Sequence, residues 1–398
     1  MAHTTIDELH GRPEKVRHRL NSIDLLRGLV MVVMALDHTR DFFSASGQNP
    51  RDITVPALFL TRWITDYCAP TFILLAGVSA YLYGTRGRTR GEVSWFLLTR
   101  GLWLILIEFT VVSFGWNLNF TGDLFIAQVI WAIGASMIVL AGLVFLPLWA
   151  IAAIGFLMIA GHNLLDGVRP EALGSFSWIW ILLHQPALLE ISSHSKLYVL
   201  YPLLPWPGVM AAGYVLGPLF KSTREFRRRF LLWAGWLLII GFVLLRATNS
   251  YGDPVGWKTE HTWLGTLLSF INCEKYPPSL LFLMMTLGPA IVLLASFEGV
   301  DGVLVRRITT YGRVPFLFYV VHIPLLHASA MALAWFTLGN TSWTFLIPFS
   351  GLTKPAAYGL NLWGVYAVWL AVVVALYPLC RWFAALKEHR HDWWLSYL

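Results

Sequence analysis

The chain has 398 residues, of which 57% are hydrophobic and only 13% are charged. Soluble domains carry about 25% charged and about 45–50% apolar residues, so this composition excludes a disordered chain and most soluble folds. The net charge of +7 does not indicate nucleic acid, because the basic residues lie in short stretches between apolar runs. The three cysteines form no CxxC or Cys/His pattern, so neither a metal site nor a disulfide framework is predicted. The expected fold is an all-α, polytopic transmembrane helical bundle.

Each long apolar run predicts one membrane-spanning helix, because backbone polar groups in lipid must be satisfied within their own segment. About ten runs meet the length of a crossing, at approximately 23–43, 65–84, 93–116, 124–144, 146–161, 200–220, 229–248, 279–297, 315–337 and 361–380. The Trp-rich stretch 176–189 is either an interfacial helix or an eleventh crossing. The expected organisation is a basic arm over 1–22, a membrane domain over 23–380 and a tail over 381–398.

Lys and Arg in the short loops predict the orientation, because cytoplasmic loops are enriched in these residues. With ten crossings, every basic cluster falls on the same side as both termini, including the cluster from Lys221 to Arg229. Both termini are therefore expected in the cytoplasm. The two longest outer loops mix aromatic and polar residues, among them Asn249, Asp253 and Trp257. Such a mixture suits either carbohydrate binding or an interfacial aromatic belt.

Ionisable residues inside the predicted spans are the candidate functional residues, because a charge at the bilayer centre costs at least about 2.5–3.5 kcal/mol. The first span carries Asp37, His38 and Asp41 in its outer half. A histidine beside a carboxylate can act as a general base while the acid orients the imidazole. We therefore predict that His38 is a base oriented by Asp37 or Asp41.

Depth arithmetic at about 1.5 Å per residue brings further ionisable side chains to the same level. Asp66 is expected near the outer end of the second span, Glu108 in the outer half of the third and His327 in the outer half of the ninth. These three side chains are predicted to line one cavity with His38. For His327, and for His322 near the midplane, a hydrogen-bonded packing role is an equally good interpretation.

Two loop segments also have unusual chemistry. Glu274 and Lys275 precede the eighth span and form a charged pair at the outer rim, which is either a substrate contact or a helix-start turn. Arg313 begins the ninth span from inside, and with Arg27 it is a candidate for holding phosphate or pyrophosphate. Charge anchoring and a structural ion pair with Asp24 are the alternatives. The sequence has no Walker, Rossmann or GxSxG motif.

Several segments resemble one known family. The stretch RLNSIDLLRG, from Arg19 to Gly28, is similar to the opening signature of the heparan-alpha-glucosaminide N-acetyltransferase family and its bacterial relatives. The likeness extends through MALDHTRDFF, TDYCAPTFILLAG, EKYPPSLLFLMMTLGPA, GRVPFLFYVVHIPLLH and the terminal DWWLSYL. These motifs run from residue 19 to the C-terminus, and together they are specific for the bacterial branch.

The resemblance implies an acyltransferase in a bacterial inner membrane. Such an enzyme takes acetyl from acetyl-CoA on the cytoplasmic side and delivers it to an amine or hydroxyl of an extracytoplasmic sugar or glycan. The expected partners are membrane lipid, acetyl-CoA and that acceptor, with no metal and no nucleic acid. A homodimer would be unsurprising. A proton-coupled transporter using the buried histidines and carboxylates, or an assembly partner in an envelope-polysaccharide pathway, are the competing classes.

An ungapped alignment of the opening signature places His38 where family members carry an important Asn. The position of their catalytic His falls near Asn49, and no His is present there. Asp66 and Pro70 match the Asp and Pro of the family's second helix. The hypothesis is that His38 deprotonates the acceptor for direct attack, or is itself acetylated. The predicted roles are catalytic for His38, Asp37, Asp41 and Asp66, CoA binding for Arg27, Arg313 and His322, and acceptor binding for Glu108, Glu274, Lys275 and His327.

Overall fold

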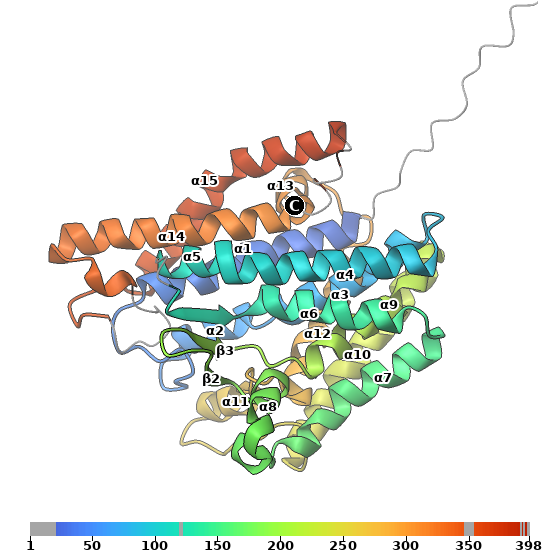
Figure 1. The fold of residues 1–398 in the computed structure, drawn as a ribbon, viewed down its shortest axis with the longest axis horizontal. Helices are drawn as coiled ribbons and strands as arrows, with labels where there is room; N and C mark the ends of the chain where they lie inside the picture. Colours follow the sequence, from blue (N-terminus) through green and yellow to red (C-terminus); the bar gives the residue numbers. More distant parts are fainter. Residues whose placement is uncertain (1–20, 119–121, 346–353, 391, 393–394, 396–398) are drawn as a thin grey trace, which may run out of the picture.

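The computed structural model describes residues 21–118, 122–345, 354–390, 392 and 395. In Figure 1 the long helices of these segments lie side by side, and one small sheet lies near one end of the bundle. The helices are α1 (Asn21–Phe43), α2 (Pro56–Thr65), α3 (Cys68–Gly84), α4 (Arg90–Ile107), α5 (Ser113–Asn117), α6 (Val129–Leu143), α7 (Leu148–Gly161), α8 (Ser177–Leu183), α9 (Pro205–Leu216), α10 (Arg224–Thr248), α11 (Trp263–Ile271), α12 (Leu280–Ser296), α13 (Val303–Arg313), α14 (Pro315–Leu338) and α15 (Leu362–His389). The basic arm predicted over 1–22 lies almost wholly outside the described residues.

Six helical segments are long and apolar enough to cross a membrane, and each corresponds to a predicted span. They are Pro56–Gly84, Arg90–Asn117, Leu148–Leu165, Arg224–Thr248, Pro315–Leu338 and Leu362–His389. The other four predicted spans also contain helices: α6 and α12, which are apolar but shorter, α9, and α1, whose 23 residues include several charges. The prediction of a helical membrane bundle is confirmed.

Large apolar side chains cover the outside of this bundle. Trp149 on α7, Trp233 on α10 and Trp363 on α15 are 75%, 79% and 79% exposed. Water would penalise such side chains, whereas lipid is as apolar as they are. The exposed surfaces of these helices are therefore suited to contact with lipid.

Several predicted boundaries are wrong. Residues 124–127 are not helical; they form strand β1 (Leu124–Ala127), which pairs in parallel with β3 (Lys196–Val199), while β2 (Ala187–Glu190) pairs antiparallel with β3. The stretch 176–189 contains only the seven residues of α8 before β2 begins. Seven residues rise about 10 Å, too little for an eleventh crossing. Helix α15 continues nine residues beyond the predicted end at 380, to His389.

Helix α1 lies at the centre of the bundle although its sequence contains several charged residues. It contacts α2, α3, α12, α13, α14 and α15, and its approach to α13 is especially close. A Cβ atom at Gly28 would lie 2.0 Å from the carbonyl oxygen of Ile308, and one at Gly312 would lie 1.8 Å from that of Asp24. Small residues allow two helix backbones to approach in this way, so these two glycines hold α13 against the first turns of α1.

Candidate active site

His38 on α1 contacts a second histidine from α14. The His38 Nδ1 atom lies 2.7 Å from His322 Nε2, and His322 Nδ1 lies 2.9 Å from the carbonyl oxygen of Phe318. The exposed fractions of the two side chains are 9% and 0%. The structure thus joins two residues that were predicted to have different roles, because His322 contacts the predicted base.

The hydrogen bonds determine which nitrogen carries each proton when both rings are neutral. A carbonyl oxygen only accepts, so His322 Nδ1 must donate to Phe318, and His322 Nε2 is then an acceptor. His38 Nδ1 must in turn donate to His322, which leaves the lone pair on His38 Nε2. No residue that the structure describes is hydrogen-bonded to that Nε2 atom. The pair can therefore present one imidazole as a base in a defined orientation.

Aromatic rings surround the histidine pair. His38 meets Trp116 edge-on, with ring centroids 5.0 Å apart, and meets Tyr319 edge-on at 6.0 Å. Phe318 stacks on His322 at 5.1 Å. This packing holds both imidazoles in fixed positions and excludes water from them.

A cavity of about 460 Å³ approaches this pair from one end of the bundle. Its lining follows α1 from Arg27 to Met34 and α14 from Pro315 to Tyr319. Met34 is four residues before His38, which is about 6 Å along the helix, and Tyr319 is one turn before His322. The cavity therefore leads along both helices toward the two histidines.

The far end of the cavity is basic, and the walls between are apolar. Five cationic side chains line it: Arg27, Arg86, Arg100, Arg313 and Lys387. Arg27 is oriented by Asp24 at 3.1 Å and by the hydroxyl of Ser79 at 2.9 Å. Arg313 contacts Glu388 of α15 at 2.7 Å. Arg27 and Arg313, the two arginines predicted to bind an anion, thus lie in the same cavity.

Neither Asp37 nor Asp41 orients His38, and that prediction is wrong. Arg40 Nη2 lies 2.6 Å from Asp37 Oδ1 and 2.8 Å from Asp41 Oδ1, and Asp37 also accepts a hydrogen bond from Thr65 at 2.7 Å. Proximity in sequence suggested a His–Asp pair, but Arg40 on the same helix competes for both carboxylates. The imidazole turns instead toward α14.

Lys275 links the loop between α11 and α12 to the charge cluster of Asp37, Arg40 and Asp41. Its Nζ lies 3.1 Å from Asp66 Oδ1 and 3.9 Å from Asp37 Oδ2. Although burial opposes its charge, Tyr276 and the two carboxylates hold the pKa of Lys275 above its ordinary value. Lys275 is buried and pairs with Asp66, so the predicted charged pair of Lys275 with Glu274 is wrong. Its neighbour Glu274 points elsewhere, since both of its carboxylate oxygens pair with Arg51 at 3.1 and 2.8 Å.

Asp66 is not near the end of a helix beginning at about 65, because the segment extends back to Pro56. Asp66 lies at the break between α2 and α3, where Arg62 Nη1 is 3.5 Å from its Oδ2 atom. Pairing with Arg62 and Lys275 allows the Asp66 carboxylate to remain inside the bundle.

None of Glu108, His327, His38 and Asp66 is among the residues that line the cavity described above. Glu108 Oε2 accepts a hydrogen bond from the Trp131 backbone N–H at 2.8 Å, where it caps the start of α6 with a carboxylate. The ring nitrogens of His327 lie 3.2 Å and 2.9 Å from the carbonyl oxygens of Gly115 and Thr344. Equal depth in the membrane did not predict which helix faces meet.

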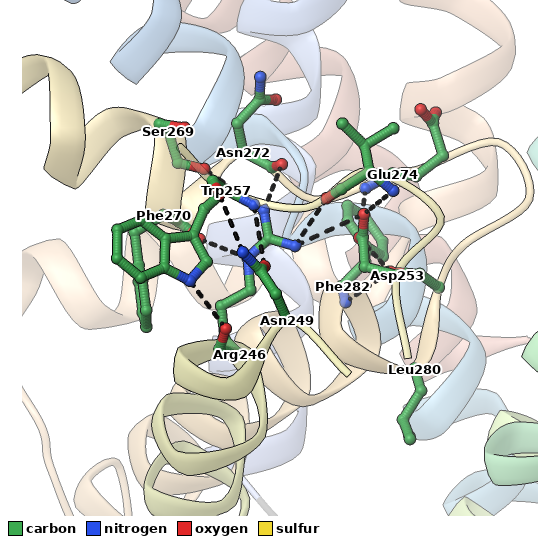
Figure 2. A network of polar contacts seen from close by, with 12 residues as sticks. Arg246, Asn249, Asp253, Trp257, Ser269, Phe270, Asn272, Glu274, Leu280 and Phe282 are labelled. Carbon is green, nitrogen blue, oxygen red and sulfur yellow. Dashed lines mark hydrogen bonds and ion pairs between the residues drawn. The ribbon is translucent and has the colours of Figure 1, made fainter. Parts of the chain in front are cut away.

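Arg246, which the sequence analysis missed, organises the segment between α10 and α12. Figure 2 shows its guanidinium surrounded by backbone carbonyl groups and by Asp253. Arg246 is 1% exposed and donates to Phe270, Val255 and Asn272 at 2.9, 2.9 and 3.1 Å. Five N–H donors in a fixed fork make arginine suited to collecting carbonyl groups. An arginine in the last turn of an apolar helix was the available signal.

The same network explains the polar residues that suggested carbohydrate binding. Asp253 Oδ2 accepts from Glu274 N at 2.8 Å and from Ser279 Oγ at 2.7 Å. Asn249 and Trp257 bond each other's polar groups at 2.9 and 3.0 Å. These side chains fold the loop that carries Lys275 to the charge cluster.

Lys354, also missed, lies beside the C-terminal end of α1. Its Nζ donates to the carbonyl oxygens of Asp41 at 2.6 Å and Ser44 at 3.2 Å. Burial lowers the pKa of Lys354 to about 8. Its sequence surroundings resemble an ordinary loop, so only the tertiary contact reveals its environment.

The catalytic-domain model of the heparan-alpha-glucosaminide N-acetyltransferase family matches residues 19–247, more than half of the chain. A search among curated proteins found no match. The match covers α1 and the helices through most of α10, including His38, Asp66 and Glu108. Together with the apolar helices, it identifies an integral membrane protein with an acetyltransferase domain. The chain belongs to the heparan-alpha-glucosaminide N-acetyltransferase family.

Proposed function

We propose that this protein transfers acetyl from acetyl-CoA, bound in the basic cavity, to an amine or hydroxyl of a sugar on the opposite side of the membrane. The observation that carries the proposal is the cavity itself. It is basic at one end, apolar along its walls and directed toward the His38–His322 pair. Family membership supplies the acetyl-transfer chemistry.

The chemistry of the donor matches this lining. The nucleotide part of CoA carries three phosphate groups, and arginine binds phosphate oxygens in bidentate fashion. Arg86, Arg100 and Arg313 line the basic end, with Arg27 and Lys387 beside them. The uncharged pantetheine arm would lie along Met31, Met34 and the other apolar walls, and the thioester would lie deepest. Because basic loops favour the cytoplasm, this end is proposed to face the cytoplasm, with the donor.

In the proposed reaction, His38 Nε2 removes a proton from the acceptor amine or hydroxyl. The acceptor heteroatom then attacks the thioester carbonyl, and the protonated His38 returns the proton to the departing CoA thiolate. His322 positions His38 by accepting from its Nδ1, so that the lone pair lies on Nε2. A positioned base of this kind contributes about 10²–10⁴-fold to a rate.

The charge cluster formed by Lys275, Asp66, Asp37, Arg40 and Asp41 lies around the part of α1 that carries His38. We propose that this cluster lines the route of the acceptor. Asp37 and Asp41 are its more exposed carboxylates, with side-chain exposed fractions of 18% and 21%. Both carboxylates remain candidates for contact with an acceptor amine or hydroxyl.

The test uses purified protein in proteoliposomes with radiolabelled acetyl-CoA outside and glucosamine-terminated acceptor inside or outside. Wild-type protein should bind CoA and should label the acceptor. His38→Ala should abolish transfer while leaving CoA binding and melting temperature unchanged. The matched control is His194→Ala, because His194 is exposed on the turn between β2 and β3.

His322→Gln separates positioning from catalysis, because a glutamine carbonyl can still accept from His38 Nδ1 whereas alanine cannot. We expect His322→Gln to retain more activity than His322→Ala, and His322→Ala to shift the pH profile of kcat. Full transfer by His38→Ala would overturn the assignment of the base. Transport of solute without acetyl-CoA would overturn the proposed function.

A further inference from the structure

Tyr319 has a buried hydroxyl whose proton has no hydrogen-bond acceptor among the described residues. Its side chain lies on α14, one turn before His322, and is only 3% exposed. The hydroxyl is inaccessible to solvent. The Trp116 indole is a neighbouring hydrogen-bonding side chain, but no group in the described part of the chain accepts the hydroxyl proton. Buried tyrosine hydroxyls usually find a hydrogen-bond partner, because an unsatisfied buried polar group destabilises the folded protein. Such a group in an acyltransferase requires an explanation.

Its location supplies one. Tyr319 lines the 460 Å³ cavity at the part nearest the histidines. Its ring meets the rings of His38 and His322 edge-on or nearly so, with centroids 6.0 and 5.6 Å apart. A thioester that extends from the basic end toward His38 must pass beside this ring. The hydroxyl therefore lies where a donor carbonyl would come within reach.

Two neighbouring groups are the competing partners for the hydroxyl. The indole N–H of Trp116 can only donate, so it cannot accept the hydroxyl proton. Glu108 lies within electrostatic range of Tyr319, but its unpaired oxygen, Oε1, is also without a partner. Its other oxygen is engaged by the Trp131 backbone. The Tyr319 proton is therefore not donated to Glu108.

We propose that the Tyr319 hydroxyl is a catalytic hydrogen-bond donor to the carbonyl oxygen of the thioester. This inference rests on the proposed function. When the acceptor heteroatom bonds to the carbonyl carbon, the electron pair of the C=O π bond moves to the oxygen, which accepts from Tyr319 O–H without proton transfer. His38 takes the proton of the acceptor. When the C=O bond re-forms, the C–S bond breaks, and His38 gives its proton to the CoA thiolate.

A donor that is already in place, in a dry site, stabilises a developing oxyanion without reorganisation. Removal of one such donor lowers kcat about 10²–10³-fold in well-studied acyl-transfer sites. Tyr319→Phe removes only the hydroxyl oxygen and preserves the ring that shapes the cavity. The expected result is a kcat reduced by about 10²–10³-fold, with the Kd for CoA unchanged.

A second readout isolates the tetrahedral state. A trifluoromethyl-ketone analogue of acetyl-CoA hydrates to a tetrahedral carbon, and we expect Tyr319→Phe to weaken its binding by about tenfold or more. Binding of CoA itself reports on folding and on the basic cavity. The matched control is Tyr311→Phe, which removes a buried hydroxyl that donates to the Val373 carbonyl at 2.9 Å. Its kcat per folded molecule should equal that of wild type.

The outcomes separate the two proposals. If wild-type protein shows no transfer that depends on acetyl-CoA, the proposed function fails. If wild type transfers acetyl and Tyr319→Phe retains its kcat and its affinity for the ketone, only the role of Tyr319 fails. If the hydroxyl donates only to a bound water, Tyr319→Phe would give this same result of unchanged kcat and unchanged affinity for the ketone. Loss of CoA affinity together with kcat would also overturn the inference, because it assigns Tyr319 to ground-state binding.

Discussion

Replacement of Lys275 by methionine should destabilise the protein, because it removes a cation buried between two carboxylates. Methionine preserves most of the aliphatic volume and deletes the ammonium group. Asp37 would keep its ion pair with Arg40 at 2.6 Å, so the stability lost at Asp37 is small. Asp66, 1% exposed, would keep only the longer contact with Arg62 at 3.5 Å. Removal of one partner from a buried ion pair costs about 3–5 kcal/mol. Because Arg62 remains beside Asp66, the expected loss in the free energy of unfolding is about 3 kcal/mol.

The assay is reversible unfolding in mixed micelles, measured for a double-mutant cycle. Asp66→Asn in the Lys275→Met background neutralises the stranded carboxylate, and it should recover at least half of the lost stability. Such coupling is expected for residues in contact. Lys258→Met changes an exposed lysine in the same loop, and its effect should lie within about 0.5 kcal/mol. Unchanged stability of Lys275→Met, or strictly additive single effects, would refute the reasoning.

Two further predictions concern packing and pH. Gly312→Ala should lower the melting temperature, at a cost of about 1–3 kcal/mol or more, because its Cβ would lie 1.8 Å from the Asp24 carbonyl oxygen; Gly142→Ala, which meets open space, serves as the control. Lys354 has a folded pKa of about 8 against about 10.4 when unfolded, so between these pH values the unfolded chain binds more protons. Stability should therefore rise with pH in that window by up to about 1.4 kcal/mol per pH unit, and a wild-type slope equal to that of Lys354→Met would contradict the assignment.

Hydropathy and composition were sufficient to predict a helical membrane bundle, because lipid requires each crossing to satisfy its backbone internally. The positions of most helices follow from the same rule. Helix prediction from hydropathy failed where polar groups form hydrogen bonds or ion pairs with partners distant in the sequence. Asp66 inside the second helical segment and Arg246 at the end of α10 are the clearest cases. Conversely, the apolar stretch at 124–127 is a strand because β3, some 70 residues later, pairs with it.

The sequence by itself determined the family and identified His38 as a candidate functional residue, since both depend on local motifs and on the rarity of ionisable residues in lipid. Only the tertiary structure decided which partner His38 has. Spacing of 1–3 residues along α1 favoured Asp37 and Asp41, but Arg40 engages both carboxylates, and His322 arrives from a helix 284 residues away. The sequence also could not show that the Tyr319 hydroxyl proton has no acceptor, because the absence of an acceptor depends on every side chain packed around the hydroxyl. Helix faces are read from sequence, whereas the pairing of those faces is settled by packing among all helices at once.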